Sequence, residues 1–295
     1  MADFSELETF VAVAGAGSFA GVARRLSLSP AMVGRRIQAL EERYGATLIE
    51  RTTRSHRLTA LGEQFLAKAR QILETAEELS ELSRPDMAQL SGRIRISAPT
   101  TLGIKRLAPV IAEMAARYPG VVFELNLSDR TVDLISEGFD LAIRIGELRS
   151  SSMVARRIGD YRFVCCAAPS YLKLHGVPEA PGDLERALCV LNLNLNPRNR
   201  WPFHNDDGTS FTVGVSGSIE IDNGEAQRAA ALAGAGIIYA PRDLVASELR
   251  DGTLVQVLER WRTMSLPIHS VRSSRRLPRR VAKLIDAIAD DLRHG

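Results

Sequence analysis

The residues with the most specific chemistry are an arginine and a glutamine placed about one helical turn apart. On a helix of about 3.6 residues per turn, Arg35 and Gln38 share a face with Ala31, and Gly34 lies at its edge. A guanidinium pairs with guanine and a carboxamide with adenine in the major groove of DNA, and small neighbouring residues let a helix approach closely. These residue types and this spacing therefore predict a helix that contacts DNA bases.

Two helices joined by a tight turn are expected to position this face. Residues 19–26 place apolar side chains at i, i+3, i+4 and i+7, and residues 33–40 carry a second apolar stripe. Ser29 suits the N-cap of the second helix and Pro30 its first position. This pattern predicts a helix-turn-helix. The alternative is an ordinary pair of helices with a solvated polar face.

A basic hairpin is predicted after the second helix. Gly45 ends that helix, and residues 47–51 and 57–59 are expected to form two short strands. The basic and hydroxyl residues expected to contact phosphates or the minor groove are Arg51, Thr53, Arg54 and Arg57. Residues 24–57 contain eight arginines and three glutamates, a charge of +5, so the rest of the +3 chain sums to −2. A polyanionic partner is therefore expected for this segment, with a plain solvated turn as the alternative for the hairpin.

A long helix is predicted over residues 59–83. Its apolar residues have nearly heptad spacing: Leu58, Leu61, Phe65, Ala69, Ile72, Ala76 and Leu79. We expect this stripe to form a dimer interface. The alternative is packing on the chain's own C-terminal domain.

A possible nucleotide site precedes the helix-turn-helix. Residues 15–20 match the dinucleotide pattern GxGxxG/A, and Glu41 follows at a plausible distance. That pattern requires a preceding strand, whereas residues 4–14 have helical periodicity. We therefore predict a helix there and no cofactor.

Residues 4–62 resemble the LysR-type transcriptional regulators. The matching residues are Phe10, GSF at 17–19, Ala23, Leu26, SPAMV at 29–33, Arg35, Ile37, LEERYG at 40–45, Leu48, RTTR at 51–54, LT at 58–59 and Gly62. Two positions differ from the family pattern: Gly34 replaces a usual serine, and Ile49 replaces an aromatic residue. The resemblance implies DNA binding, and the two differences bear on which bases are preferred.

From Gly92 onward strands alternate with helices, which favours a parallel sheet in an α/β domain. The expected strands are residues 93–97, 121–127, 140–145, 162–168, 218–222, 237–240 and 267–272. The expected helices are residues 102–118, 132–137, 225–233 and 279–292. This order resembles the effector domain of the same family, which has two lobes like a periplasmic binding protein.

The resemblance implies an α/β protein with an N-terminal winged helix-turn-helix, a long linker helix and a two-lobed effector domain. The expected boundaries are 1–60 for DNA binding, 61–90 for the linker and dimerisation helix, and 91–295 for the effector domain, with lobe one at 91–161 and 268–295 and lobe two at 162–267. Hinges are expected near Arg162 and Pro267. The partners it implies are double-stranded DNA with an interrupted inverted repeat, a small-molecule effector, a second copy or three further copies of the chain, and RNA polymerase as a further candidate.

The effector is expected at strand-to-helix junctions facing each other across a cleft, where free N–H groups favour an anion such as a small carboxylate. The candidate residues are Thr100, Thr101, Ser128, Arg144, Asn223 and Glu225. Ordinary helix capping and a surface arginine are the alternative. The carboxylate of Glu225 can itself satisfy the N–H groups of the helix and compete with an anion, which would favour a hydroxyl or ammonium group of the effector in this lobe instead.

Other classes of protein find little support in the sequence. The chain has no HExxH, GxSxG or P-loop motif, and its five histidines are scattered, so no enzyme and no metal site are predicted. The three cysteines lack a metal-ligand spacing and are expected to be small buried residues. The acidic start of the chain and the absence of a long apolar run predict a cytoplasmic protein with no membrane partner, rather than a secreted solute-binding subunit.

Overall fold

The structure is a computed structural model that describes residues 4–16, 19–51, 56–82, 90–130, 134, 137–148, 153–205, 209–273 and 277–294. The chain divides into two compact units, which are residues 1–90 with 133–138, and residues 91–132 with 139–295. No helix in these described ranges is long and apolar enough to cross a membrane.

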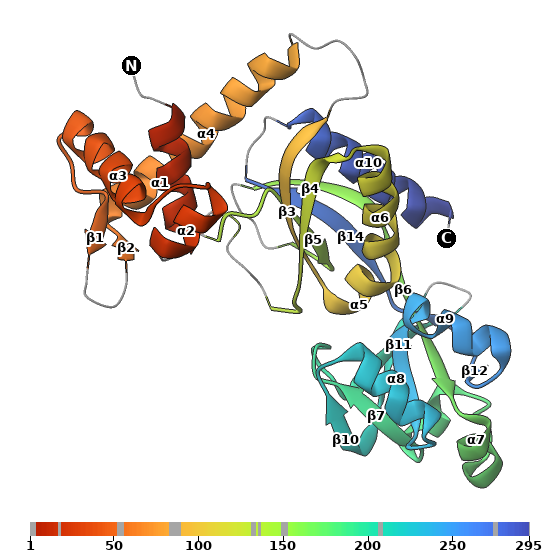
Figure 1. Ribbon diagram of the computed structural model, residues 1–295. Coiled ribbons are helices and arrows are strands. Elements are labelled where there is room, and N and C mark those ends of the chain that lie inside the picture. The colour runs from red at the N-terminus through yellow and green to blue at the C-terminus, as the bar shows by residue number, and fades with distance from the viewer. Residues whose placement is uncertain are drawn as a thin grey trace. The chain divides into compact units, whose positions relative to one another are not determined.

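Unit 1 consists of helices and a two-stranded wing (Figure 1). Its elements are α1 (Phe4–Ala16), α2 (Phe19–Arg25), α3 (Pro30–Tyr44), β1 (Ile49–Arg51), β2 (His56–Leu58) and α4 (Ala60–Leu82). The two strands are antiparallel, with Glu50 opposite Arg57. These elements confirm the winged helix-turn-helix, with the first strand shorter than predicted and the second shifted by one residue. Since α1 precedes Gly17, the strand that a dinucleotide pattern requires is replaced by a helix.

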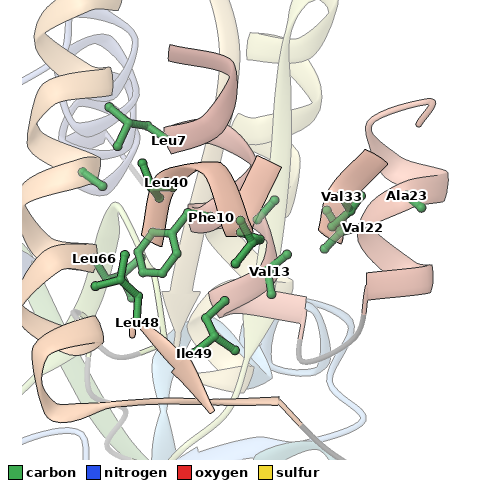
Figure 2. Close-up of a cluster of buried hydrophobic side chains, with 13 residues drawn as sticks. Leu7, Phe10, Val13, Val22, Ala23, Val33, Leu40, Leu48, Ile49 and Leu66 are labelled. Atoms are coloured by element: carbon green, nitrogen blue, oxygen red, sulfur yellow. The ribbon is translucent and has the colours of Figure 1, made fainter. Parts of the chain in front are cut away.

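One apolar cluster forms the core of unit 1 (Figure 2). It contains Leu7, Phe10, Ala12, Val13, Val22, Ala23, Val33, Ile37, Leu40, Leu48, Ile49, Leu66 and Ala69. Three of these residues, Val33, Ile37 and Leu40, are the predicted inward stripe of α3. Because burial of apolar area is the dominant stabilising force in folding, this stripe determines which face of α3 remains outside.

The long helix α4 is present as predicted, but its apolar stripe has two separate environments. Leu66 and Ala69 are buried in the core of unit 1, and the ring of Phe65 packs edge-on against Phe10 with centroids 5.4 Å apart. By contrast, Leu61 and Ile72 are 49% and 45% exposed. The prediction that the whole stripe forms a dimer seam is therefore wrong for Phe65 and Ala69, because the core of unit 1, which includes α1, already covers them. Dimerisation through the exposed residues of α4 stays a prediction.

Unit 2 is built on a mixed sheet with the strand order β10-β7-β11-β6-β14-β5-β3-β4, to which β12 adds by pairing with β6. β3 is parallel to β4 and β5, and β7 is parallel to β10 and β11. β6 and β14, however, are antiparallel to each other and to their other neighbours. The expected parallel sheet is thus corrected to a mixed one, because β6 carries the chain out of lobe one and β14 carries it back.

Lobe one contains one half of this sheet and the helices that cover it (Figure 1). Its elements are β3 (Ser91–Ala98), α5 (Thr100–Leu102), the π-helical turn η1 (Gly103–Leu107), α6 (Ala108–Arg117), β4 (Gly120–Leu127), β5 (Leu141–Ile145), the first part of β6 (Val154–Ala167), β14 (Ser265–Arg272) and α10 (Arg279–His294). The helix predicted at 102–118 is therefore α5, η1 and α6 in succession. The short helix predicted at 132–137 falls almost entirely outside the described residues.

Lobe two contains the rest of the sheet. Its elements are the end of β6, α7 (Pro169–His175), the 3₁₀ turn η2 (Pro181–Glu185), β7 (Leu188–Asn192), β10 (Ser216–Ile221), α8 (Gly224–Leu232), β11 (Ile237–Pro241), α9 (Arg242–Asp251) and β12 (Val255–Val257). A separate three-stranded sheet, which was not predicted, consists of β8 (Arg200–His204), β9 (Ser210–Gly214) and β13 (Arg262–Thr263). The pairing partner of β6 changes from β14 to β11 between Arg162 and Phe163.

The three cysteines lie in lobe two as buried free thiols, as predicted. Burial raises the pKa of Cys166 and of Cys189 to about 12. The nucleophilic form of a cysteine is the thiolate, so both side chains behave as small apolar residues at neutral pH.

Candidate DNA-binding surface and effector site

The start of α3 is fixed by the capping arrangement that the sequence predicts. Ser29 has φ −79° and ψ 152°, and its Oγ accepts a hydrogen bond from the Met32 N–H at 3.2 Å. Pro30 follows at the first helical position. Since the N-cap satisfies a backbone donor that lacks a helical partner, it defines where α3 begins and how its outer face is oriented.

The outer face of α3 carries the predicted base-contacting residues. Ala31, Arg35 and Gln38 are exposed, and Gly34 is half-buried. The Gln38 Nε2 donates to Glu42 Oε1 at 2.8 Å. A base edge bound by Gln38 would have to replace this partner on the same helix, whereas Arg35 lies on an exposed helix surface.

Two other arginines of α3 hold the helix against α1. Arg36 Nη1 donates to Thr9 Oγ1 at 3.2 Å and to the Ser5 carbonyl oxygen at 3.5 Å. Arg43 Nη2 lies 3.0 Å from Glu6 Oε1. Adjacent arginines on α3 thus have different roles, and Arg35 is the one that faces outward.

The wing is anchored to the end of α3 by a glutamate. Gly45 ends the helix in the left-handed conformation, with φ 61° and ψ 32°. Glu41 Oε1 then accepts hydrogen bonds from the N–H groups of Leu48 at 2.8 Å and Ile49 at 3.0 Å. The sequence indicated Glu41 only in the nucleotide pattern and in the motif LEERYG. Its role in the wing was missed because its backbone partners lie seven and eight residues further along the chain, beyond the turn at Gly45.

The other side of the wing is fixed by the start of α4. Thr59 Oγ1 donates to the Thr47 carbonyl oxygen at 2.9 Å and accepts from the Gly62 N–H at 2.9 Å. A Cβ on residue 62 would lie 2.1 Å from the Leu48 carbonyl oxygen, so only glycine fits there. The first turn of α4 therefore lies directly against the backbone of Leu48, just before the first strand of the wing.

The wing residues are described only in part. Arg57 in β2 is exposed, and Ile49, which replaces the family's aromatic residue, is 3% exposed and belongs to the core. Arg51 lies in β1, but its side chain falls outside the described residues. Thr53 and Arg54 also fall outside them.

In lobe one, the candidate effector residues already interact with the protein. The Thr100 N–H donates to Asp129 Oδ1 at 3.0 Å, and Ser128 Oγ accepts from the Arg130 N–H at 3.2 Å. Arg144 donates to Ser97 Oγ at 3.0 Å and to the Ile143 carbonyl oxygen at 2.8 Å.

In lobe two, the candidate residues surround the start of α8. Asn223 is the N-cap, and its Oδ1 accepts from the Ala226 N–H at 3.1 Å. Glu225 forms ion pairs with Lys105 of lobe one at 3.1 Å and with Arg228 at 2.8 Å. Burial raises the pKa of Glu225, but the hydrogen bonds from Arg228 and Lys105 outweigh it and leave the pKa below its ordinary value. Lys105 was not anticipated from the sequence.

The structure brings Thr101 of lobe one against the start of α8 in lobe two. Thr101 is 8% exposed, and a Cβ on residue 224 would lie 2.4 Å from its Oγ1. Thr101 also hydrogen-bonds the side chain of Tyr161, whose pKa is raised mainly by burial. Residues 100–101 therefore meet residues 223–225, as predicted. The hydrogen bonds given above for Ser128 and Arg144 are made to residues of lobe one and do not reach lobe two.

Comparison with known proteins places both units in one family. Residues 4–63 match the family described as "Bacterial regulatory helix-turn-helix protein, lysR family", and residues 87–293 match the "LysR substrate binding domain". Together these two matches cover the helix-turn-helix of unit 1 and most of unit 2.

Similar proteins match over nearly the whole chain. The regulator named "Uncharacterized HTH-type transcriptional regulator YhjC" of Escherichia coli K12 is 35% identical over 93% of this chain and 93% of its own length. The transcriptional repressor PA14_22550 of Pseudomonas aeruginosa is 32% identical over 98% of this chain and 92% of its own. The solved structure of CrgA, a LysR-type regulator from Neisseria meningitidis, has 29% identity and a TM-score of 0.63, with 98% of each chain covered.

The exposed face of α3, the wing and the two-lobed domain thus occur together in one chain, in the same order as in these relatives. The chain therefore belongs to the LysR family: it is a DNA-binding transcriptional regulator with a C-terminal effector-binding domain.

Proposed function

We propose that this protein binds an interrupted inverted repeat in double-stranded DNA as a homodimer or homotetramer, and that a small carboxylate between the two lobes changes the arrangement of its DNA-binding heads. Residues 1–60 serve DNA binding, 61–90 linkage and dimerisation, and 91–295 effector binding, with lobe one at 91–161 and 268–295 and lobe two at 162–267. The observation that carries the proposal is the outer face of α3, where Ala31, Arg35 and Gln38 are exposed while Arg36 is bound to α1.

In this proposal the DNA contacts divide into two kinds. Arg35 and Gln38 contact base edges, and Ala31 and Gly34 let the helix approach them. The wing residues Arg51, Thr53, Arg54 and Arg57 contact phosphates or the minor groove. Ser29 and Pro30, at the start of α3, complete the DNA-binding surface. A basic segment with exposed arginines, here residues 24–57 with a charge of +5, is the usual footprint of such binding.

The effector is proposed to bind where lobe one meets lobe two. The residues assigned to it are Thr100, Thr101, Ser128, Arg144, Asn223 and Glu225. Two observations support this assignment: Thr101 packs against the start of α8, and Lys105 supplies a positive charge at the same junction. Glu225 already pairs with Lys105, and Asp129 already accepts from the Thr100 N–H, so an effector carboxylate must compete with these two acids.

Self-association is proposed to use the exposed apolar residues of α4. Leu61 and Ile72 are eleven positions apart, which is close to three helical turns, so they lie on one face. Two heads are needed because half-sites lie about one DNA turn, ~34 Å, apart. RNA polymerase is a further proposed partner. We place the protein in the cytoplasm, where bacterial DNA is, and assign it no catalytic activity.

Selection of bound duplexes from a random pool by the full-length protein tests this function. We expect the recovered sequences to share an inverted repeat whose half-sites are separated by about one DNA turn. Protection of the recovered site from cleavage should change when an effector carboxylate is added. Recovery of sequences without a common motif would contradict the proposal.

A further inference from the structure

Lys105 is held in a turn of unusual geometry at the lobe junction. Gly103–Leu107 is π-helical, and such turns are frequent at functional sites. Gly103 is buried, and a Cβ on it would lie 2.1 Å from Leu127 Cδ2, so the turn is pressed closely onto β4. This turn places Lys105 and Arg106 where each forms an ion pair with lobe two.

Two ion pairs connect the lobes from this turn. Lys105 Nζ lies 3.1 Å from Glu225 Oε1, in the first turn of α8. Arg106 Nη1 lies 3.3 Å from Asp243 Oδ1, in the first turn of α9. Their side chains are 25% and 13% exposed, respectively, so both charges are partly removed from water and depend on their partners.

Arg106 is fixed within lobe one as well. Its Nε lies 2.8 Å from Asp291 Oδ2, and its Nη2 donates to the Asp291 carbonyl oxygen at 2.5 Å. A guanidinium with partners on both lobes has little freedom to accept another anion. Arg106 is therefore suited to a permanent connection.

The Lys105–Glu225 pair differs because Glu225 has a second cation. Arg228 Nε lies 2.8 Å from Glu225 Oε2, and Arg228 Nη1 lies 2.6 Å from Glu248 Oε1. If Lys105 moved away, Glu225 would still be paired with Arg228. An incoming carboxylate would in turn pair with Lys105, so neither charge would be left alone.

We propose that Lys105 is the residue that binds the effector's carboxylate, and that it does so by exchanging Glu225 for the ligand. The inference rests on the proposed function, in which the effector is a carboxylate between the lobes. Exchange removes one of the two ion pairs that cross from the turn to lobe two and leaves the Arg106 pair in place. The ligand therefore favours a different lobe arrangement, because it interacts with Lys105 only when Glu225 has moved away.

Calorimetry on the full-length protein tests the exchange with a panel of acetate, succinate and benzoate and the three matching amides. The parent should bind at least one acid more tightly than its amide. Lys105→Gln should weaken that binding by about tenfold or more, since a charge-assisted hydrogen bond is lost. Glu225→Gln should strengthen it, because the internal competitor loses its charge. Lys283→Gln is the control, since Lys283 is an exposed lysine on α10 of the same lobe.

Each other result has a distinct meaning. Equal affinity in Lys105→Gln and the parent would overturn the assignment of Lys105 and leave a carboxylate effector standing. Weaker binding in Glu225→Gln would overturn the exchange, because Glu225 would then assist the ligand. Equal binding of acids and amides by the parent, or no binding of any acid, would overturn both this proposal and the carboxylate effector.

Discussion

The two units of this protein use their basic residues in opposite ways. On α3 of unit 1, Arg35 is exposed on a helix whose other side is fixed by the core. At the lobe junction of unit 2, Lys105 and Arg106 are each paired with an acid of the protein itself. Unit 1 thus presents its charge to an external polyanion, whereas unit 2 satisfies its own charges, and a ligand there must replace a contact.

This difference has consequences for the energy of binding. DNA binding by exposed arginines releases counterions and depends steeply on salt. A partly exposed ion pair such as Lys105–Glu225 contributes only about 0–1 kcal/mol to stability, so a ligand would displace it at little cost. Unit 1 is therefore suited to tight, salt-sensitive binding and unit 2 to a reversible change of partner.

The largest effect is expected where a covered and an exposed position of the α4 stripe, Phe65 and Ile72, are compared. Phe65→Ala removes a ring that packs on Phe10 and Tyr44, so the free energy of unfolding should fall by about 2–4 kcal/mol. Ile72→Ala, at an exposed position, should change it by less than about 0.5 kcal/mol and should instead weaken self-association. Denaturant unfolding measures the free energy of unfolding, and analytical ultracentrifugation measures self-association. The same loss of stability in both variants would remove the distinction between the two positions.

The next effect concerns how closely the lobes of unit 2 pack. Gly224→Ala brings a Cβ to 2.4 Å from Thr101 Oγ1 and 3.2 Å from Leu244 Cδ2, so it should destabilise the protein by about 1–3 kcal/mol. Gly182→Ala is the matched control, because nothing lies within 4 Å of its added Cβ. Thermal unfolding compares them. A Gly224→Ala variant as stable as the control would mean that the lobes are not held this closely in solution.

A smaller, sequence-independent effect is expected in the wing. Arg57→Ala should weaken binding to all duplexes alike and reduce the slope of log affinity against log salt by about one unit. Fluorescence anisotropy at several salt concentrations measures this slope, with Arg250→Ala in α9 as the control. An unchanged slope would show that Arg57 does not contact a phosphate.

How much the sequence could predict also differs between the units. Ser29, Pro30 and Gly45 mark the ends of α3 locally, so its bounds and outward face were predicted correctly. Lys105 and Arg106 gave no such signal, because their partners lie in other elements, with Asp243 137 positions away from Arg106. Helices α7 and α9, strand β7 and the three-stranded sheet were missed since short elements with irregular patterns have weak periodicity.

The smallest effect is expected at the glycine on the outer face of α3. Gly34→Ala should stabilise unit 1 by about 0.5–1 kcal/mol, because alanine favours helix and its Cβ would be 3.9 Å from Phe19 Cε2. Thermal unfolding checks this, and DNA selection with the same variant shows whether base preference changes. A loss of stability would mean that the fold itself requires Gly34.

The most direct test of the account is a competition gel shift that compares the selected operator with a permuted duplex of the same composition. The account predicts that Arg35→Ala loses about 1–3 kcal/mol of discrimination, roughly tenfold to a hundredfold, at one base pair. Arg57→Ala should weaken both duplexes equally and leave their ratio unchanged. If Arg35→Ala kept the operator preference of the parent, the assignment of the α3 outer face to base recognition would be contradicted.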